Sequence, residues 1–476
     1  MSEATRVLIV SYEAAPFFKT GGLGDVMGSL PKALVGLGVD ARLVIPYYQQ
    51  VREKYPKFNR IGEFRIYFGA KEEEIGVYED TCVPHVYFLS NRANLSHVNT
   101  RGRNKRIEQF AFFSLAVSHF LLWLSKNRGW KSDIMHCNDW HTALVPLILQ
   151  KLNLSTKTLL SIHNLEYQGF GSIKVVDFLN LKNEDIKEIK RENPVKAIDM
   201  LGEGILHADV VSTVSPNYAA EIMASEENHH RIIYSYLRRR EKEGLADGKI
   251  IGILNGIDYE VWNPSKDKLL FQAYSNLDWK EGKKKNKEEL LQSLNLPIDR
   301  PTFCFVGRMA AQKGVELLIR IIPRMAALNV NVIFLGQGDP NIEKSVKRIV
   351  GKYPQFAAAS LSYNEEVGHR FYAASDFIVI PSHFEPCGLI QMIAMRYGTL
   401  PIASKTGGLK DSIKNGRNGF LFQKNSSRAL LKTIKKALSI YHDVNKFNSM
   451  VENAMKTDFS WDKSAVLYKK LYQKMI

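Results

Sequence analysis

The chain has few cysteines, no long uninterrupted apolar run and no repeated or low-complexity segment. Its most membrane-like run, 110–124, is only about 15 residues long and is interrupted by polar side chains, so a buried helix fits better than a bilayer span. The apolar stretch 7–10 is too short for a secretory signal. We therefore expect a cytoplasmic protein that does not enter the membrane. The scattered spacing of the cysteines argues against disulfides and against a zinc site. They are Cys82, Cys137, Cys304 and Cys387.

Acidic residues are scarce relative to basic ones, with 49 Asp and Glu against 65 Lys and Arg, which gives a formal net charge of +16. Such a balance first suggests a nucleic-acid partner. No nucleic-acid-binding motif accompanies the two densest basic runs, 238–240 and 283–285, and we assign both to solvated connecting stretches. A small anionic ligand would also be attracted by a positive field. We therefore predict no nucleic-acid partner.

A length of 476 residues is too great for one compact core and suits two domains of about 200 to 250 residues. Short apolar runs recur along the chain, and several are followed by a glycine-rich or polar loop and then a helical pattern. This alternation is typical of α/β domains with parallel sheets. We predict an α/β fold with a domain boundary near residue 250.

Two strand-to-helix junctions lie side by side between residues 376 and 411. The apolar run 377–380 predicts a buried parallel strand, followed by a helix from about 387 to 397. A second strand, 400–403, precedes Gly407 and Gly408, whose bare amides can approach a phosphate. Parallel sheets bind ligands at the carboxyl ends of their strands. Glu385 beside such an anion-binding loop indicates chemistry on a phosphorylated ligand.

A glycine-rich loop follows the first predicted strand, 7–10. It contains Lys19, Gly21 and Gly22 but lacks the full dinucleotide-binding fingerprint. A loop that approaches a phosphate and a tight turn with a surface lysine both fit these residues. The helix that follows ends at the glycines near residue 37.

Two further strand ends in the first half carry polar candidates. Asp139 follows the strand 133–136 and is flanked by histidines, but a metal site would need a third ligand on a rigid element. His163 follows the strand 158–162, and a lone histidine is usually structural. Both residues nevertheless lie where a parallel sheet binds its ligands.

The second half opens with a strand, 302–306, and a short loop that holds Arg308 and Lys313. A guanidinium that binds two oxygens, with an ammonium nearby, forms a phosphate clamp by charge and geometry. An ordinary surface pair is the alternative.

Several of these motifs together resemble the signature of bacterial glycogen synthases and plant starch synthases. The matching stretches are 19–23 (KTGGL), 385–389 (EPCGL) and 406–409 (TGGL), and they occur in the family's order. The resemblance implies two Rossmann-like domains that face each other across a cleft, the GT-B type. We accordingly assign 1–249 to an acceptor-side domain, 250–458 to a nucleotide-sugar-binding domain and 459–476 to a helix that crosses back to the first.

The resemblance implies transfer of glucose from ADP-glucose to the non-reducing end of an α-1,4-glucan, with retention of configuration and without a metal or other cofactor. ADP rather than UDP is taken from the bacterial members of the family. The implied catalytic residues are Glu385, Asp139, His163, Arg308 and Lys313. The implied donor-binding residues are Arg308 and Lys313 again, with Lys19, Gly21, Gly22, Asn255, Cys387, Gly388, Leu389, Thr406, Gly407 and Gly408.

Three departures from the family pattern accompany this resemblance. Ile393 stands where many proteins of this fold carry a second glutamate, eight residues after Glu385. The stretch 226–240 lacks the expected glycine-rich pattern, and 90–106 is shorter than usual. We expect these departures to alter acceptor handling and to leave donor chemistry in place. Two alternatives on the same fold are a catalytically weak glucan-binding or scaffolding protein and a retaining transferase with another acceptor.

Overall fold

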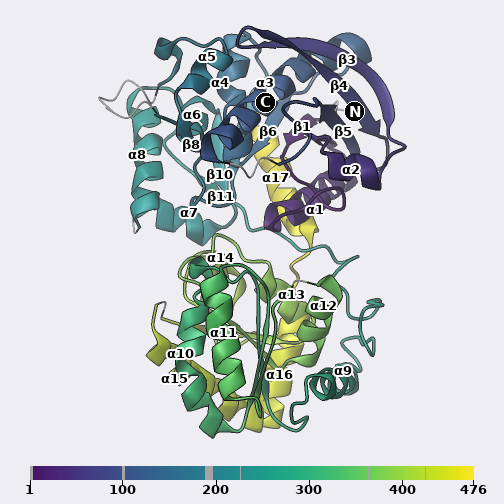
Figure 1. Cartoon of the computed structure of the whole chain (residues 1–476), viewed down its shortest axis with the longest axis vertical. Helices are drawn as coiled ribbons and strands as arrows, with labels where there is room; N and C mark the ends of the chain where they lie inside the picture. The colour runs from purple at the N-terminus through teal and green to yellow at the C-terminus, as the bar shows by residue number, and fades with distance from the viewer. Residues whose placement is uncertain (1–3, 99–101, 188–196, 226, 363, 424) are drawn as a thin grey trace. The chain divides into compact units, whose positions relative to one another are not determined.

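The computed structural model describes residues 4–98, 102–187, 197–225, 227–362, 364–423 and 425–476 (Figure 1). The chain forms two compact units. The first comprises Met1–Gly256 together with Trp461–Ile476, and the second comprises Ile257–Ser460. We placed the first boundary at 249/250. In the structure, Ile251 still pairs with Ser212 in the sheet of the first unit. The functional labels given to the predicted domains stay predictions.

The first unit is built on a nine-stranded sheet in the order β11-β10-β7-β6-β1-β2-β5-β4-β3. It is parallel except where β4 runs antiparallel to β3 and β5. The hairpin of β3 and β4 was not predicted. The strands are β1 (Arg6–Val10), β2 (Asp40–Pro46), β3 (Asn59–Phe68), β4 (Lys71–Asp80), β5 (His85–Ser90), β6 (Ile134–Asn138), β7 (Lys157–Ile162), β10 (Val210–Thr213) and β11 (Ile251–Gly252), and a separate pair is formed by β8 (Phe170–Ser172) and β9 (Ala197–Asp199).

Alternate residues of β1 belong to two separate cores, because successive side chains of a strand point to opposite faces of the sheet. Leu8 and Val10 belong to one buried cluster, whereas Val7 and Ile9 belong to the other. Helices cover both faces of the sheet (Figure 1). They are α1 (Gly22–Gly36), α2 (Gln49–Lys54), α3 (Arg103–Arg128), α4 (Val145–Lys151), α5 (Lys174–Phe178), α6 (Met200–His207), α7 (Pro216–Met223), α8 (Asn228–Lys242) and α17 (Trp461–Met475).

Helix α3 contains the apolar run that we interpreted as a buried helix. It is long and apolar enough to cross a membrane, but its most apolar window is 83% buried within the protein. Phe110, Phe112 and Phe113 are fully buried in the core. Gly129, with φ at +62°, ends the helix in the left-handed conformation that glycine adopts without steric cost. The helix is therefore part of the core of the first unit.

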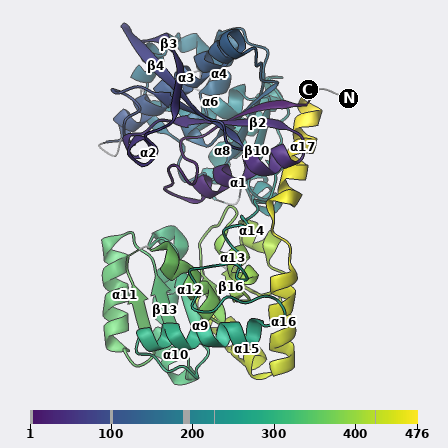
Figure 2. The ribbon, with the colours of Figure 1, turned by 90° about the vertical axis from the view of Figure 1, so that its right-hand side faces the viewer.

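The last helix, α17, returns to the first unit and packs beside α1 (Figure 2). Tyr468 and Tyr472 are buried in the same cluster as Val7. The Tyr472 hydroxyl lies 2.8 Å from Nδ1 of His136 on β6, and Lys469 donates to the Leu37 carbonyl at the end of α1. These buried contacts make α17 an integral part of this core.

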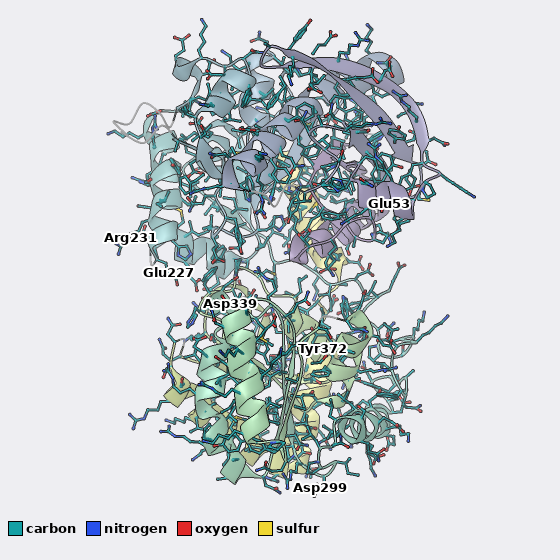
Figure 3. All side chains as sticks on the ribbon, in the orientation of Figure 1. Glu53, Glu227, Arg231, Asp299, Asp339 and Tyr372 are labelled. Atoms are coloured by element: carbon teal, nitrogen blue, oxygen red, sulfur yellow. The ribbon has the colours of Figure 1, made fainter. Side chains whose placement is uncertain are left out.

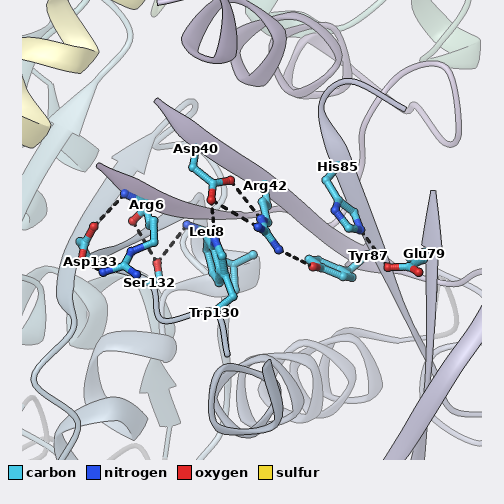
Figure 4. A network of polar contacts seen from close by, with 10 residues as sticks. All are labelled: Arg6, Leu8, Asp40, Arg42, Glu79, His85, Tyr87, Trp130, Ser132 and Asp133. Atoms are coloured by element: carbon cyan, nitrogen blue, oxygen red, sulfur yellow. Dashed lines mark hydrogen bonds and ion pairs between the residues drawn. The ribbon is translucent and has the colours of Figure 1, made fainter. Parts of the chain in front are cut away.

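A polar network closes the amino-terminal ends of the strands in the first unit (Figure 4). The Arg6 amide donates to Asp133, at 2.7 Å, and thereby joins the start of β1 to the residue before β6. Arg42 on β2 lies between the Asp40 carboxylate and the Tyr87 hydroxyl. This end of the sheet is thus occupied by structural contacts, and the opposite end is left for the loops that carry the candidate site.

The second unit has a fully parallel six-stranded sheet in the order β14-β13-β12-β15-β16-β17. The strands are β12 (Thr302–Val306), β13 (Asn331–Leu335), β14 (Ala357–Ser360), β15 (Phe377–Ile380), β16 (Leu400–Ser404) and β17 (Phe420–Phe422). The helices are α9 (Trp279–Ser293), α10 (Val315–Met325), α11 (Pro340–Lys352), α12 (Glu365–Ala374), α13 (Ile390–Arg396), α14 (Gly407–Ser412), α15 (Ser427–His442) and α16 (Val444–Lys456). The model thus confirms the predicted α/β class.

Candidate active site

The strand order of each sheet explains where the predicted residues lie. In the first unit β1 lies between β2 and β6, and in the second β12 lies between β13 and β15. In both sheets the strand order reverses at this point, and open parallel sheets bind ligands in the crevice that forms there. The loops after β1, β6 and β7 carry the candidates of the first unit, and the loops after β12, β15 and β16 carry those of the second.

Lys313, which is partly buried, and buried Glu385 form an ion pair at the switch point of the second unit. Lys313 Nζ lies 2.7 Å from Glu385 Oε2 and 3.0 Å from Oε1. Glu385 is 7% exposed, and the Ser382 hydroxyl donates to the same carboxylate at 2.9 Å. The sequence analysis did not single out Ser382. The pair fixes an acid and a cation, carried by neighbouring strand ends, in one position.

Arg308 lies on the loop after β12, which also carries Lys313. Its side chain is exposed, and its Nη2 donates to Gln312 Oε1 at 3.3 Å. Gln312 in turn donates to the Phe384 carbonyl, so it links the loop after β12 to the loop after β15. An exposed guanidinium held by a buried glutamine is available to an anionic ligand.

The two glycines after β16 make a backbone contact that the sequence analysis did not predict. We expected bare amides, but the Gly408 amide donates to the carbonyls of Glu385 and Pro386, at 3.1 and 3.2 Å. A Cβ on Gly407, whose φ is +41°, would lie 2.0 Å from the Glu385 carbonyl oxygen, and one on Gly408 would lie 2.3 Å from that of Cys387. In this structure the glycines therefore let two strand-end loops pack together and hold the backbone of Glu385.

The other candidates of the second unit surround this contact. Cys387 and Thr406 are buried, and Thr406 is the N-cap residue of α14. Gly388 has φ at +72°, and Leu389 is the N-cap residue of α13. This helix begins at Ile390, three residues later than predicted. All four residues lie within one turn of a helix start.

In the first unit, Asp139 follows β6 in a strained backbone conformation, with φ at +58° and ψ at −179°. Such geometry costs about 1–3 kcal/mol in a residue other than glycine and is concentrated at functional sites. Its Oδ1 accepts hydrogen bonds from the amides of His163, at 2.6 Å, and Asn164, at 3.3 Å. Burial raises the pKa of the Asp139 carboxyl to about 7, and the nearby Glu13 carboxylate adds to this rise.

His163 is oriented by the same turn. Its Nε2 lies 2.9 Å from Asn138 Oδ1, which can only accept, so Nε2 carries the proton and Nδ1 is the acceptor. Burial lowers the pKa of His163 to about 3, so the ring is neutral at pH 7. The structure therefore brings Asp139 and His163 together, as the neighbouring positions of β6 and β7 require.

The glycine-rich loop after β1 is held by a carboxylate that the sequence analysis missed. Buried Glu13 accepts hydrogen bonds from the Thr20 amide and hydroxyl and from the Gly24 amide. Burial raises the pKa of Glu13. A single carboxylate among apolar loop residues was the signal in the sequence. Lys19 is exposed and pairs with Asp25 at 2.5 Å.

Three other predicted residues of the first unit lie at its surface or its end. Gly21 is the N-cap residue of α1, and Gly22 is its exposed first residue. Asn255 is buried near the boundary of the unit, and its Oδ1 has no hydrogen-bond partner among the described residues. A buried acceptor of this kind is suited to a donor on a ligand.

Our interpretation of the two basic runs as solvated connecting stretches is wrong. Both lie in helices, and each contributes a buried member. Arg240 is 1% exposed and donates to three carbonyls at the end of α6, those of Ile205, Ala208 and Asp209. Buried Lys283 donates to the Ala373 carbonyl in the last turn of α12, and to the Tyr397 carbonyl and Thr399 hydroxyl after α13. The last carbonyls of a helix have no amide donor within the helix, and these two cations supply donors to them. A count of charges cannot reveal this role.

The segment 226–240 also differs from expectation. Residue 226 lies outside the described residues, and most of the remainder belongs to α8, which packs on α6 and α7. A regular helix therefore stands where the family pattern led us to expect a glycine-rich loop. Arg231 projects from this helix into solvent, near Glu227 (Figure 3). Of the shortened stretch 90–106, residues 99–101 lie outside the described part.

Within the described ranges, no group of three or more histidine, cysteine, aspartate or glutamate side chains has an arrangement that could hold a metal ion. The charged groups among the candidates are Arg308, Lys313 and Glu385 in the second unit, and Lys19, Glu13 and Asp139 in the first. Such a set can bind an anionic ligand directly through cationic side chains.

Comparisons with known proteins cover nearly the whole chain. Residues 6–234 match the starch synthase catalytic domain, and residues 286–457 match the glycosyl transferases group 1 domain. Glycogen synthases of Caldicellulosiruptor bescii and Thermodesulfovibrio yellowstonii are 39% and 36% identical, and each match covers 99% of this chain and at least 98% of the relative. The catalytic domain of starch synthase IV from Arabidopsis thaliana, bound to ADP and acarbose, matches with a TM-score of 0.87 at 32% identity, over 100% of this chain and 99% of that one.

Proposed function

The chain belongs to the glycogen and starch synthase family of glycosyltransferases, and from this premise we propose that it transfers glucose from ADP-glucose to the non-reducing end of an α-1,4-glucan, with retention of configuration. The observation that carries the proposal is the Lys313–Glu385 ion pair at the switch point of the second sheet, on the same loop after β12 that carries Arg308. The enzyme is a hexosyltransferase that works in the cytoplasm. Its partners are the sugar nucleotide and the glucan.

In the second unit the cationic side chains stabilise the negative charge of the leaving group. When the glucosyl bond breaks, negative charge develops on the diphosphate, and donors already in place stabilise it without reorganisation. Arg308 is exposed and supplies a planar pair of donors, whereas Lys313 supplies a point charge fixed by Glu385. Glu385 counters the positive charge that develops at the anomeric carbon and holds a sugar hydroxyl.

In the first unit Asp139 and His163 orient the sugar. The bond to Asn138 leaves Nδ1 of His163 as an acceptor, so it accepts a hydrogen bond from a sugar hydroxyl while the ring stays neutral. Oδ1 of Asp139 accepts hydrogen bonds from two backbone amides, so Oδ2 is the atom that accepts from a sugar hydroxyl. Lys19, on the loop that Glu13 holds, supplies a further cation for the diphosphate.

The test is the release of ADP from ADP-glucose, measured with and without glycogen and compared with release of UDP from UDP-glucose. We expect glucan-dependent turnover that is faster with ADP-glucose. Faster turnover with UDP-glucose would remove the donor assignment. An absence of turnover with both donors would favour a glucan-binding or scaffolding protein on the same fold.

We also propose that the altered stretches shift acceptor preference and leave the donor KM normal. The first unit contains both stretches, and in place of a glycine-rich loop it has α8, whose Tyr236 donates to Asp199 at the start of α6. Kinetics with short maltooligosaccharides and with glycogen test this, before and after residues 226–240 are replaced by a glycine-rich loop. A change in donor KM with no change in acceptor preference would contradict it.

A further inference from the structure

Tyr12, which follows β1, joins two of the loops that carry site candidates of the first unit. Its hydroxyl lies 2.9 Å from the Thr20 hydroxyl, in the glycine-rich loop. Its ring stacks on the ring of His141, in the turn after β6, with centroids 3.7 Å apart and an angle of 22° between the planes. The sequence analysis did not single out this tyrosine. One partly buried side chain thus contacts both the loop of Lys19 and the turn that follows Asp139.

The hydroxyl of Tyr12 adds to the contacts by which Glu13 holds the glycine-rich loop. Thr20 donates its own hydroxyl proton to Glu13, at 2.6 Å, so the Thr20 oxygen is the acceptor for Tyr12. Burial raises the pKa of Tyr12, and the Glu13 carboxylate adds to this rise, so the phenol keeps its proton at neutral pH. The contact is therefore a neutral hydrogen bond that fixes the loop at the residue after Lys19.

The ring of Tyr12 packs against the turn after β6. Nδ1 of His141 is buried and has no hydrogen-bond partner within the part of the chain that the structure describes, so packing fixes this ring. Trp140 and Phe110 also pack against it, with centroids at 4.1 and 4.6 Å, but the stack with Tyr12 is closer. The turn follows the strained backbone of Asp139, and such strain persists only where the surroundings over-determine it. Tyr12 is one part of those surroundings.

We propose that Tyr12 is a positioning residue for the transfer reaction and that it holds the Lys19 loop and the Asp139 turn at a fixed distance from each other. Lys19 is the cation proposed for the diphosphate, and Asp139 is proposed to orient the glucosyl unit, so both ends of the donor depend on this distance. The hydroxyl of Tyr12 acts on the loop, and its ring acts on the turn. The kinetic consequence rests on the proposed function, whereas the effect on the two segments does not.

Tyr12→Phe separates the two contacts, because it removes the hydroxyl and keeps an aromatic ring, whereas Tyr12→Leu removes both. We expect Tyr12→Phe to lower kcat/KM for ADP-glucose about three- to tenfold, as the loss of one neutral hydrogen bond implies. Tyr12→Leu should lower it further. The KM for glycogen should stay unchanged in Tyr12→Phe, because the lost contact lies on the loop proposed to bind the donor.

Lys19→Ala supplies the readout that a merely structural role would not move. If Tyr12 acts through Lys19, the cost of Lys19→Ala in kcat/KM should be smaller when residue 12 is already Phe, by about the factor that Tyr12→Phe itself causes. An equal cost of Lys19→Ala in both backgrounds would overturn the proposal. An effect of Tyr12→Phe confined to the KM for glycogen would overturn it as well.

Tyr87→Phe is the matched control. This change also removes a hydroxyl that forms a hydrogen bond, with Arg42, but at the opposite end of the same sheet (Figure 4). It should leave kcat/KM for ADP-glucose unchanged. A fall equal to that of Tyr12→Phe would show that any lost hydroxyl contact in this unit has the same effect, and would overturn the proposal.

Amide hydrogen exchange measured by mass spectrometry tests the two segments without a substrate. Amides of both segments, 18–24 and 139–143, are held by hydrogen bonds in the structure. We expect exchange in 18–24 to be about three- to tenfold faster in Tyr12→Phe, with 139–143 unchanged, and faster exchange in both segments in Tyr12→Leu.

Unchanged exchange in 18–24 for Tyr12→Phe, or in 139–143 for Tyr12→Leu, would overturn the inference even if transfer from ADP-glucose is demonstrated. The expected exchange in a protein whose wild type shows no transfer from any sugar nucleotide would instead refute the proposed function. The role of Tyr12 in holding the two segments would then stand.

Discussion

Changing Asp139 to Asn should make the first unit more stable and the enzyme less active. The carboxylate is 8% exposed, and the change to an amide of the same shape removes the charge that burial disfavours. Asparagine also tolerates positive φ better than most residues, and its Oδ1 can still accept from the His163 amide. The substitution thus separates the cost of the charge from the loss of contacts.

The magnitude follows from the proton equilibrium. Burial raises the pKa of Asp139 from 3.8 to about 7. At about 1.4 kcal/mol for each tenfold change in proton affinity, this rise corresponds to an upper value of about 4 kcal/mol. Since the unfolded chain releases this proton near pH 4 and the folded chain near pH 7, the free energy of unfolding falls as pH rises between these values. Above pH 8 the loss is complete.

We therefore expect the free energy of unfolding of the variant to exceed that of the wild type by about 2 kcal/mol at pH 8. This is less than the upper value because relaxation around the charge compensates part of it. At pH 4, where the wild-type carboxyl is protonated, the difference should be small. Urea denaturation of the first unit at both pH values measures this difference. Asp133→Asn, the same chemical change at a partly exposed aspartate, is the control. We expect kcat to fall about 100-fold, as for loss of one preorganised hydrogen-bonding group. A variant that is less stable at pH 8, or that gains equally at both pH values, would refute the reasoning.

Three other changes test the second unit and the basic run. Lys313→Ala should lower kcat about 100- to 1000-fold in the ADP-release assay, and it should lower the melting midpoint because it leaves a buried glutamate without its cation. Gly407→Ala should lower both kcat and the melting midpoint. Gly416→Ala, also at positive φ but with open space around its Cβ, should lower each of them less. Arg240→Met should cost about 2 kcal/mol or more in denaturation of the first unit, whereas the exposed Arg238→Met should cost little. Equal effects within either pair would contradict the structure.

The sequence predicted the strand-end loops well, because short buried strands and the residues that follow them are local features. The positions after β12 and β15 could be read from the apolar runs that end at Val306 and Ile380. Parallel pairing then brings their loops together, and this pairing is a general rule of the fold. The proximity of Lys313 and Glu385 follows from it.

Other features could not be predicted because they depend on partners distant in sequence. The role of Arg240 is set by carbonyls more than 30 residues away, and nothing local distinguishes it from its exposed neighbour Arg238. Gly408 looked like a phosphate donor because its surroundings were unknown, and its amide proved to be engaged by the loop after β15. Glu13 was missed for a different reason, since its partners Thr20 and Gly24 lie close to it in the sequence. A carboxylate that only accepts from its own loop has no characteristic spacing.

The return of α17 to the first unit has a consequence for synthesis on the ribosome. The second unit is one continuous stretch, Ile257–Ser460, and all of it emerges before Trp461. The first unit, although most of it is made first, lacks the tyrosines that complete one of its two cores until residues 461–476 have been made. The later unit is thus the first that can fold completely, against the usual amino-to-carboxyl order. Until then the unfinished amino-terminal part exposes the apolar surface that α17 covers.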